Sequence, residues 1–307
     1  MLFERVVVAA LAIGIALPAA AAPAQSVSAT KLAAFQAQTC TPLPPSASKL
    51  PWEAGERLSF EIDVMGASAG NLVLIAMPPV GKGTSQELPF RSLAASNSFF
   101  SKVRRVRGRS TSYVRAKDFH PRRYEEETNE GGVLRSAQVV FTRPSDGSLM
   151  KVDWLRDKEK GHANLRYQND AFDPVSAAYM MRTLDFREGQ SLCFDSYGIR
   201  KLWRLKGKVV GLEEVRVPAG TFQAWHVEGL AVRTDDPRSA REIHVWITND
   251  ERRLPVAALG VIDLGAVRAQ LSSVGKGPDP SEESITAEIA SPSPPAPKPA
   301  TARPLVK

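Results

Sequence analysis

Apolar and polar residues alternate one by one along most of the chain, and this period of two constrains the fold more than any other feature. Residues 58–64 are the clearest example, with the sequence Leu-Ser-Phe-Glu-Ile-Asp-Val. Each such run predicts a strand with one buried and one solvated face. Comparable runs occupy residues 72–77, 124–128, 136–142, 149–154, 163–167, 201–209, 213–217, 221–232, 242–248 and 261–271. Roughly ten to twelve strands are too many for one flat sheet, so we expect a mostly β fold whose antiparallel meander curls into a barrel, half-barrel or sandwich.

Turns and one short helix separate the expected strands. Turn-forming residues at 131–132, 144–147 and 158–161 favour antiparallel pairing of neighbouring strands. A helix is expected after Asp173, because this residue is a good N-cap and Pro174 suits the first helical position. The segment Val-Pro-Ala-Gly-Thr at 217–221 predicts a tight hairpin in which Gly220 adopts a left-handed conformation.

The two ends of the chain differ from the alternating part. Residues 1–24 combine an early arginine, a run of about a dozen apolar residues and a cluster of small residues, which predicts a cleavable export signal. The apolar run is shorter than the roughly 20 residues of a spanning helix, and an uncleaved anchor is the alternative. We expect a lead-in at 25–54, a β domain at 55–272 and a disordered Pro-rich tail at 273–307. The mature protein is then periplasmic or secreted and has no transmembrane segment.

Cys40 and Cys193 are the two cysteines of the chain. In an oxidising compartment an even count of two favours one disulfide, which would tie the lead-in to the domain. Two buried thiols are the alternative.

The formal net charge of +7 points to anionic partners, because charges in the expected signal and tail cancel and leave the surplus on the folded part. Within residues 200–209, one strand face carries a basic stripe, defined as Arg200, Arg204, Lys206 and Lys208, while Trp203 lies on the opposite, buried face. These five residues are the candidate ligand-binding set. A solvated face that prevents edge-to-edge aggregation is the alternative. Export and the lack of a recognition motif argue against nucleic acid.

Catalytic and metal sites have weaker support. Ser68 lies in a G-x-S-x-G sequence with His226 and His244 downstream, but a nucleophile elbow needs a strand before the serine and a helix after it, whereas a strand is expected next. The four histidines lack ligand spacing, so neither a metal nor another cofactor is expected. If their strands pair, His226 and His244 approach each other on one face. In the run Glu125-Glu126-Glu127 only the outer two share a face, and they read as surface pairing with neighbouring arginines.

Several segments together resemble one bacterial family. They are Gly-Glu-Arg-Leu-Ser-Phe at 55–60, Ala-Gly-Asn-Leu at 69–72, Phe-His-Pro at 119–121 with Tyr124, Asp-Pro-Val-Ser at 173–176 with Tyr179 and Arg182, Gly-Leu-Glu at 211–213, Val-Pro-Ala-Gly-Thr-Phe at 217–222, Val-Trp-Ile-Thr at 245–248 with Asp250, and Leu-Pro-Val at 254–256. In this order they are similar to the exported proteins of Domain of Unknown Function 3108. The resemblance implies an antiparallel β fold in the cell envelope and no established activity. In outline that fold is similar to the open barrels of periplasmic lipoprotein carriers, which hold acyl chains on a concave apolar face.

The sequence therefore favours a non-catalytic exported protein that binds or assists an anionic lipid, a glycan or another envelope component. Trp203, Trp225 and Trp246 are expected in the core or in a cavity wall. Two alternatives remain, an esterase-like hydrolase that uses Ser68 and a structural protein that tethers an envelope protein through its Pro-rich tail.

Overall fold

A computed structural model describes residues 27–43, 49–103, 105–143, 147–198, 200–262 and 265–290 of the protein. The expected export signal lies outside these residues, and so does the expected tail from residue 291 onward.

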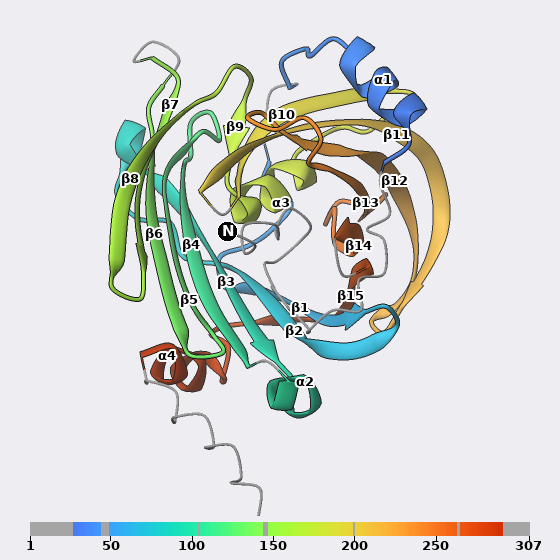
Figure 1. The fold of residues 1–307 in the computed structure, drawn as a ribbon. Helices are drawn as coiled ribbons and strands as arrows, with labels where there is room; N and C mark the ends of the chain where they lie inside the picture. The colour runs from blue at the N-terminus through green and yellow to red at the C-terminus, as the bar shows by residue number, and fades with distance from the viewer. Residues whose placement is uncertain are drawn as a thin grey trace, which may run out of the picture.

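Fifteen strands form one continuous sheet that curls around a helix (Figure 1). The strands are β1 (Glu56–Val64), β2 (Ala67–Ala76), β3 (Glu87–Ser96), β4 (Val106–Arg115), β5 (Pro121–Glu130), β6 (Val133–Phe141), β7 (Leu149–Arg156), β8 (Glu159–Arg166), β9 (Ala171–Phe172), β10 (Ser191–Gly198), β11 (Lys201–Val217), β12 (Gly220–Arg233), β13 (Ala240–Thr248), β14 (Pro255–Ile262) and β15 (Gly265–Lys276). The mostly β fold predicted from the alternation is confirmed.

The strand order shows two meanders that meet where the chain's first and last strands pair. On one side of the β1–β15 pair, the strands follow in the order β1 to β8. On the other side they follow in the reverse order, from β15 to β9. In register, Phe60 on β1 lies opposite both Leu72 on β2 and Leu271 on β15. All pairs of neighbouring strands are antiparallel except β9 with β10. The sheet is not closed, since β8 and β9 form its two edges.

A short connection holds the two edges near each other. Only residues 167–170 join β8 to β9, so the five steps from Arg166 to Ala171 span at most about 18 Å. The carboxylate of Asp195 on β10 accepts hydrogen bonds from the backbone amides of Gln168 and Asn169 at 2.8 and 3.2 Å. The sheet is therefore a curled, open barrel fastened across its gap by polar contacts.

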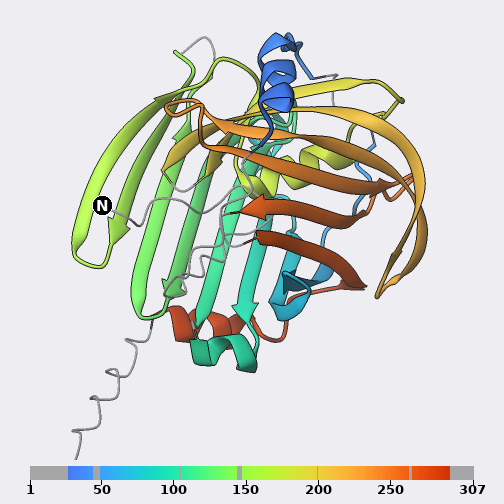
Figure 2. The ribbon, with the colours of Figure 1, turned by 45° about the vertical axis from the view of Figure 1, so that its right-hand side comes forward.

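Helices lie on both sides of the sheet. The described helices are α1 (Ala29–Ala37), the 3-10 turn η1 (Gly83–Ser85), α2 (Ser98–Val103), α3 (Pro174–Arg182) and α4 (Glu282–Ala290). Helix α3 lies inside the curve, whereas α1 and α4 lie outside it (Figures 1 and 2). Helix α4 lies against β3, β4 and β5, and its Ile285 and Ile289 belong to an apolar cluster with Val73, Ile75 and Leu93 of β2 and β3. None of the described helices has the length and apolar character needed to cross a membrane.

The lead-in packs on the domain through α1 and a covalent bond. Leu32 and Phe35 contact the outward side chains of Leu230 and Val232 on β12. A disulfide joins Cys40 to Cys193 on β10, and their Cα atoms are 5.3 Å apart. The disulfide expected from the cysteine count is confirmed, and it fixes the segment that follows α1.

Several boundaries differ from the sequence-based expectations. The structure has more strands than expected, because β3, β4, β9, β10 and β14 were not predicted. Residues 201–217, which were expected to form two strands, form one strand with a bulge after Val209. Ordered structure also continues past residue 272, since β15 reaches Lys276 and α4 follows it. The isoleucines of α4 give that part of the tail an apolar face to bury. The hairpin at 217–221 forms as predicted, with Val217 opposite Gly220, whose φ is +137°.

Candidate ligand cavity

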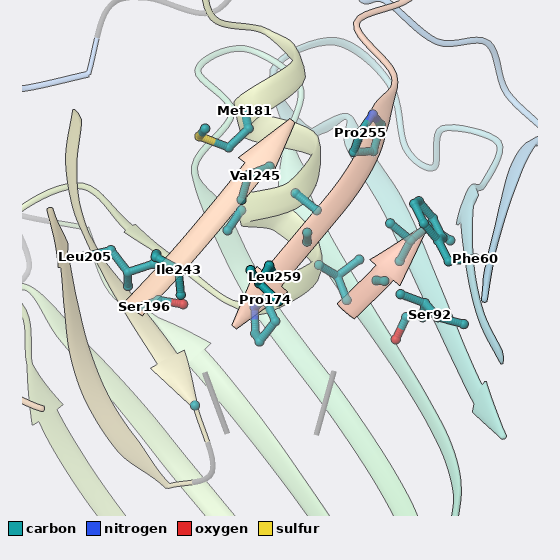
Figure 3. A pocket seen from close by; sticks show the side chains of 18 of the residues that line it. Phe60, Ser92, Pro174, Met181, Ser196, Leu205, Ile243, Val245, Pro255 and Leu259 are labelled. Atoms are coloured by element: carbon teal, nitrogen blue, oxygen red, sulfur yellow. The ribbon is translucent and has the colours of Figure 1, made fainter. Parts of the chain in front are cut away.

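A cavity of about 260 Å³ lies between α3 and the concave face of the sheet (Figure 3). Most of its wall is apolar. Representative lining residues from both meanders and from α3 are Phe60, Leu74, Met181, Phe194, Val245 and Ala258. At about 30 Å³ for each water-sized group, the space holds about eight or nine such groups, and it approaches the roughly 300 Å³ of small ligand pockets.

Small residues at inward strand positions create this space. Gly108 on β4 and the cross-strand pair Gly207 and Gly229 on β11 and β12 all line the cavity. A Cβ atom added to Gly229 would lie only 2.4 Å from the carbonyl oxygen of Lys206. Because no side chain fits at Gly207 or Gly229, these two glycines let β11 and β12 approach closely and leave the volume in front of them unfilled.

The N-terminus of α3 is fixed by a buried aspartate. The Asp173 carboxylate accepts from the backbone amides of Val175 and Ser176 at 3.0 and 2.9 Å, and Ser176 bonds back to complete a capping box. The second carboxylate oxygen of Asp173 accepts from the hydroxyl of Ser112 on β4 at 2.6 Å. Burial raises the pKa of Asp173, and these donors oppose the rise. The contact with β4 fixes α3 across the interior of the sheet.

The C-terminus of α3 is anchored by a buried arginine. The Arg182 guanidinium is 1% exposed and forms a two-point ion pair with Glu56 on β1, with one contact of 3.1 Å. It also donates to the backbone carbonyls of Pro51, Arg252 and Arg253 at 3.0, 2.8 and 3.1 Å. One side chain thus ties α3 to the lead-in, to β1 and to the turn between β13 and β14.

A carboxyl group interrupts the apolar cavity wall. Glu126 occupies an inward position on β5, and its two oxygens accept from the hydroxyls of Tyr124 at 3.0 Å and Tyr197 at 3.2 Å. Burial raises the pKa of Glu126, the tyrosine hydrogen bonds lower it, and the nearby Asp173 raises it further. Burial also raises the pKa of both tyrosines, so they remain protonated donors. Beside them Ser92 and Ser110 share a hydrogen bond of 2.6 Å.

Glu126 was not identified from the sequence as a site residue. Surface pairing with neighbouring arginines is expected only for Glu125 and Glu127. Glu125 pairs with Arg123 at 3.7 Å, whereas Glu127 pairs with Arg109 on β4 at 2.8 Å. The available signal was the alternation itself, because it places Glu126 on the opposite face from Glu125 and Glu127. An acidic residue on the buried face of a strand marks a position that needs a partner.

The basic stripe makes mainly intramolecular contacts. Arg204 forms an ion pair with the fully buried Asp195 at 2.9 Å, and Lys206 donates to the carbonyls of Phe35 and Gln38 at 2.9 and 2.6 Å. The Arg200 guanidinium lies 4.4 Å from the centre of the Trp154 ring on the opposite meander. Lys208 is the exposed member. Arg200 and Arg204 therefore make contacts at the gap between the two sheet edges, and Lys206 holds the segment around α1. Anion binding by the stripe stays a prediction.

The three tryptophans have different surroundings. Trp203 is 6% exposed and its Nε1 donates to the carbonyl of Gly198 at 3.4 Å. Trp225 and Trp246 are half-buried and pack against the core. Trp203 is thus buried, Trp225 and Trp246 are only half-buried against the core, and none of the three is among the residues that line the cavity. The phenylalanine and tyrosine residues that do line it are Phe60, Tyr124 and Phe194.

Ser68 lies near the start of β2, in the hairpin that joins β1 to β2. Its hydroxyl accepts from the amide of Asn97 at 3.2 Å, and the same amide donates to its carbonyl at 2.8 Å. The chain continues from Ser68 as a strand in an antiparallel sheet. This is not the strand–turn–helix context that an elbow nucleophile needs.

His226 and His244 meet on one face, as strand pairing allows. Their Nε2 and Nδ1 atoms are 2.9 Å apart, and the His226 ring stacks on Trp246 with centres 4.7 Å apart. Burial, followed by the neighbouring His226, lowers the pKa of His244. No group of three or more potential metal ligands occurs within the described part of the chain.

Comparisons with solved structures and curated proteins offer no activity. A search of curated proteins finds no match. A β-barrel-like protein of domain of unknown function DUF1849 from Brucella abortus is 10% identical, with a TM-score of 0.47 over 73% of this chain and 98% of that one. A putative exported protein with a YmcC-like fold from Bacteroides fragilis is 9% identical, with a TM-score of 0.36 over 76% and 100% of the two chains. A putative lipoprotein from Parabacteroides distasonis is 11% identical, with a TM-score of 0.30 over 78% and 100%.

One family model matches the sequence over residues 59–272, which is more than half of the chain. The match covers nearly the whole sheet from β1 to β15 and all of α3. The expected resemblance is confirmed, and the chain belongs to the family described as protein of unknown function DUF3108.

Proposed function

We propose that the protein is an exported, non-catalytic binding protein whose cavity holds the apolar chain of an envelope amphiphile. The observation that carries this proposal is the cavity of about 260 Å³ between α3 and the concave face of the sheet. Its wall is mainly apolar, which suits an acyl or alkyl chain better than a glycan, because sugar hydroxyls need many polar partners.

Two further features support a role at the envelope. The Cys40–Cys193 disulfide is of a kind that persists in oxidising compartments, which favours the periplasm or the exterior of the cell. The net charge of +7 favours approach to anionic surfaces such as lipid head groups. The protein then meets its ligand at an anionic envelope surface and encloses the apolar part.

The volume limits the ligand. Engineered cavities of about 150 Å³ bind a molecule the size of benzene, so about 260 Å³ accommodates one chain of roughly eight carbons or one segment of a longer chain. Two full acyl chains do not fit into the cavity as it stands.

Lipid extraction and mass spectrometry of the purified protein test the proposal. We expect a stoichiometric alkyl or acyl compound from the unmodified protein and its loss from Ala178→Leu, which adds bulk to the cavity face of α3. The matched control is Ala33→Leu on the exposed face of α1, which should retain the compound. A blank extract at high protein concentration, together with no binding of added alkyl probes, would contradict the proposal.

A further inference from the structure

The interior carries a carboxyl group that the apolar cavity alone does not explain. Glu126 lines the cavity and receives one tyrosine hydroxyl on each oxygen. An ionised carboxylate accepts about four hydrogen bonds, so each oxygen keeps capacity for a further donor. Among the described residues, no cationic side chain is paired with Glu126. Arg109 and Lys206 also border the cavity, but Arg109 pairs with Glu127 and Lys206 donates to the carbonyls of Phe35 and Gln38.

The tyrosines show that this carboxyl is held in place. Tyr124 is 4% exposed and Tyr197 is fully buried, and their rings are 5.8 Å apart. Tyr124 shares strand β5 with Glu126, whereas Tyr197 comes from β10 near the opposite edge of the sheet. The curl of the sheet brings the two meanders together at this carboxyl. One tyrosine hydroxyl from each meander then fixes the orientation of the Glu126 carboxyl toward the cavity.

Burying a carboxylate without a cation is costly, and an ion pair in a low-dielectric site is much stronger than one in water. Burial is the main factor that disfavours ionisation of Glu126, and the fully buried Asp173 adds to it. A bound cation would remove this penalty. A bound carboxylate would increase it, because two like charges would then share the cavity.

We infer that Glu126, oriented by Tyr124 and Tyr197, is the polar anchor of the cavity and binds the protonated amine of an amphiphile whose apolar chain fills the remaining space. This assignment rests on the proposed function and specifies the chemistry of its ligand. The basic exterior and the acidic interior then act at different steps. The basic surface draws the protein to anionic surroundings, and Glu126 selects the charge of the ligand head group that enters the cavity.

Three probes with the same chain length separate this inference from the proposed function. Octylamine, octanol and octanoate each have eight carbons, which the cavity volume allows, and they differ in the charge of one terminal group. Calorimetric titration of the full purified protein at neutral pH should give octylamine a dissociation constant at least tenfold lower than that of octanol. Octanoate should bind more weakly than octanol.

The matched variants are Glu126→Gln and Glu125→Gln, which alter neighbouring residues on opposite faces of β5. Glu126→Gln keeps the shape of the side chain. It should lower the affinity for octylamine at least tenfold and change the affinity for octanol by less than about threefold. Each factor of ten in affinity corresponds to about 1.4 kcal/mol. Glu125→Gln should change neither. Circular dichroism checks that both variants fold, and the comparison of probes on the unmodified protein does not depend on either variant.

Each outcome decides between the two proposals. Equal affinity for octylamine and octanol in the unmodified protein, or an equal loss of both in Glu126→Gln, overturns the role of Glu126 and leaves the apolar cavity standing. No measurable binding of any of the three probes overturns the proposed function itself.

Discussion

The ion pair between Arg182 and Glu56 gives the sharpest prediction about stability, because it anchors the helix that forms one wall of the cavity. Arg182 is 1% exposed, the side chain of Glu56 is 12% exposed, and the guanidinium also serves three backbone carbonyls. Glu56→Gln removes the negative charge and leaves a buried guanidinium without its counterion. Removing one partner of a buried pair costs about 3–5 kcal/mol, and glutamine retains one acceptor, so we expect a loss of about 3 kcal/mol.

Urea unfolding followed by tryptophan fluorescence measures this loss, since the Trp52 ring centre lies 5.2 Å from the Arg182 guanidinium. In thermal unfolding, a loss of about 3 kcal/mol corresponds to a decrease in Tm of about 6–12 °C for a domain of this size. Glu53→Gln is the control. Its partner is Lys276 at 3.0 Å and both side chains are highly exposed, so its loss should stay below about 1 kcal/mol. If the two variants lose similar stability, the reasoning about the α3 anchor is wrong.

Three further perturbations have defined outcomes. Cys40→Ser, measured by urea unfolding, should lower the free energy of unfolding by about 2–5 kcal/mol, because the disulfide joins residues 153 positions apart; an unchanged value would contradict this. Ile285→Ala should cost at most about 2 kcal/mol, because α4 can detach while the barrel persists, and hydrogen exchange should increase in α4 alone. The lowered pKa of His244 means that the folded state binds fewer protons than the unfolded state. The contribution of His244 to the free energy of unfolding is fully present above the ordinary histidine pKa of 6.5, and it is lost as the pH falls through the lower pKa of the folded state. His244→Gln should therefore reduce the loss of stability between about pH 7 and pH 5.

Much of the fold could be predicted from local sequence. Alternation identified the strands whose inward positions carry large apolar residues, such as β1 with Phe60 and Ile62. The N-cap Asp173 and the first-turn Pro174 located α3, and the Val-Pro-Ala-Gly-Thr segment located the hairpin between β11 and β12. In each case a few neighbouring residues determine the backbone conformation.

Two of the missed strands, β4 and β10, have identifiable physical causes. The inward residues of β4 include Gly108, Ser110 and Ser112, which face the cavity or α3 and so show no apolar alternation. β10 is buried on both faces, since all its residues after Ser191 are buried, and it therefore does not alternate either. The alternation rule therefore fails where the inward positions of a strand carry glycine and serine, as in β4, or where both faces of a strand are buried, as in β10.

The site itself depends on contacts between distant parts of the chain. Tyr197 reaches Glu126 across 71 positions of sequence, and Arg182 reaches Glu56 across 126. Nothing local to these residues specifies such pairs. The basic stripe shows a second limit. Alternation assigns Arg204 and Lys206 to one strand face, but it does not reveal their partners, which are Asp195 for Arg204 and the carbonyls of Phe35 and Gln38 for Lys206.

The most direct test of the central claim is a methyl NMR titration of the protein with octanol. Met181 lines the cavity on α3 and is 7% exposed, whereas Met65 lies in the turn between β1 and β2 and is 73% exposed. If the space under α3 accepts an apolar chain, the Met181 methyl signal shifts and saturates while the Met65 signal stays unchanged. A Met181 signal that does not move up to the solubility limit of octanol, or equal unsaturated shifts at both methyls, would contradict the account.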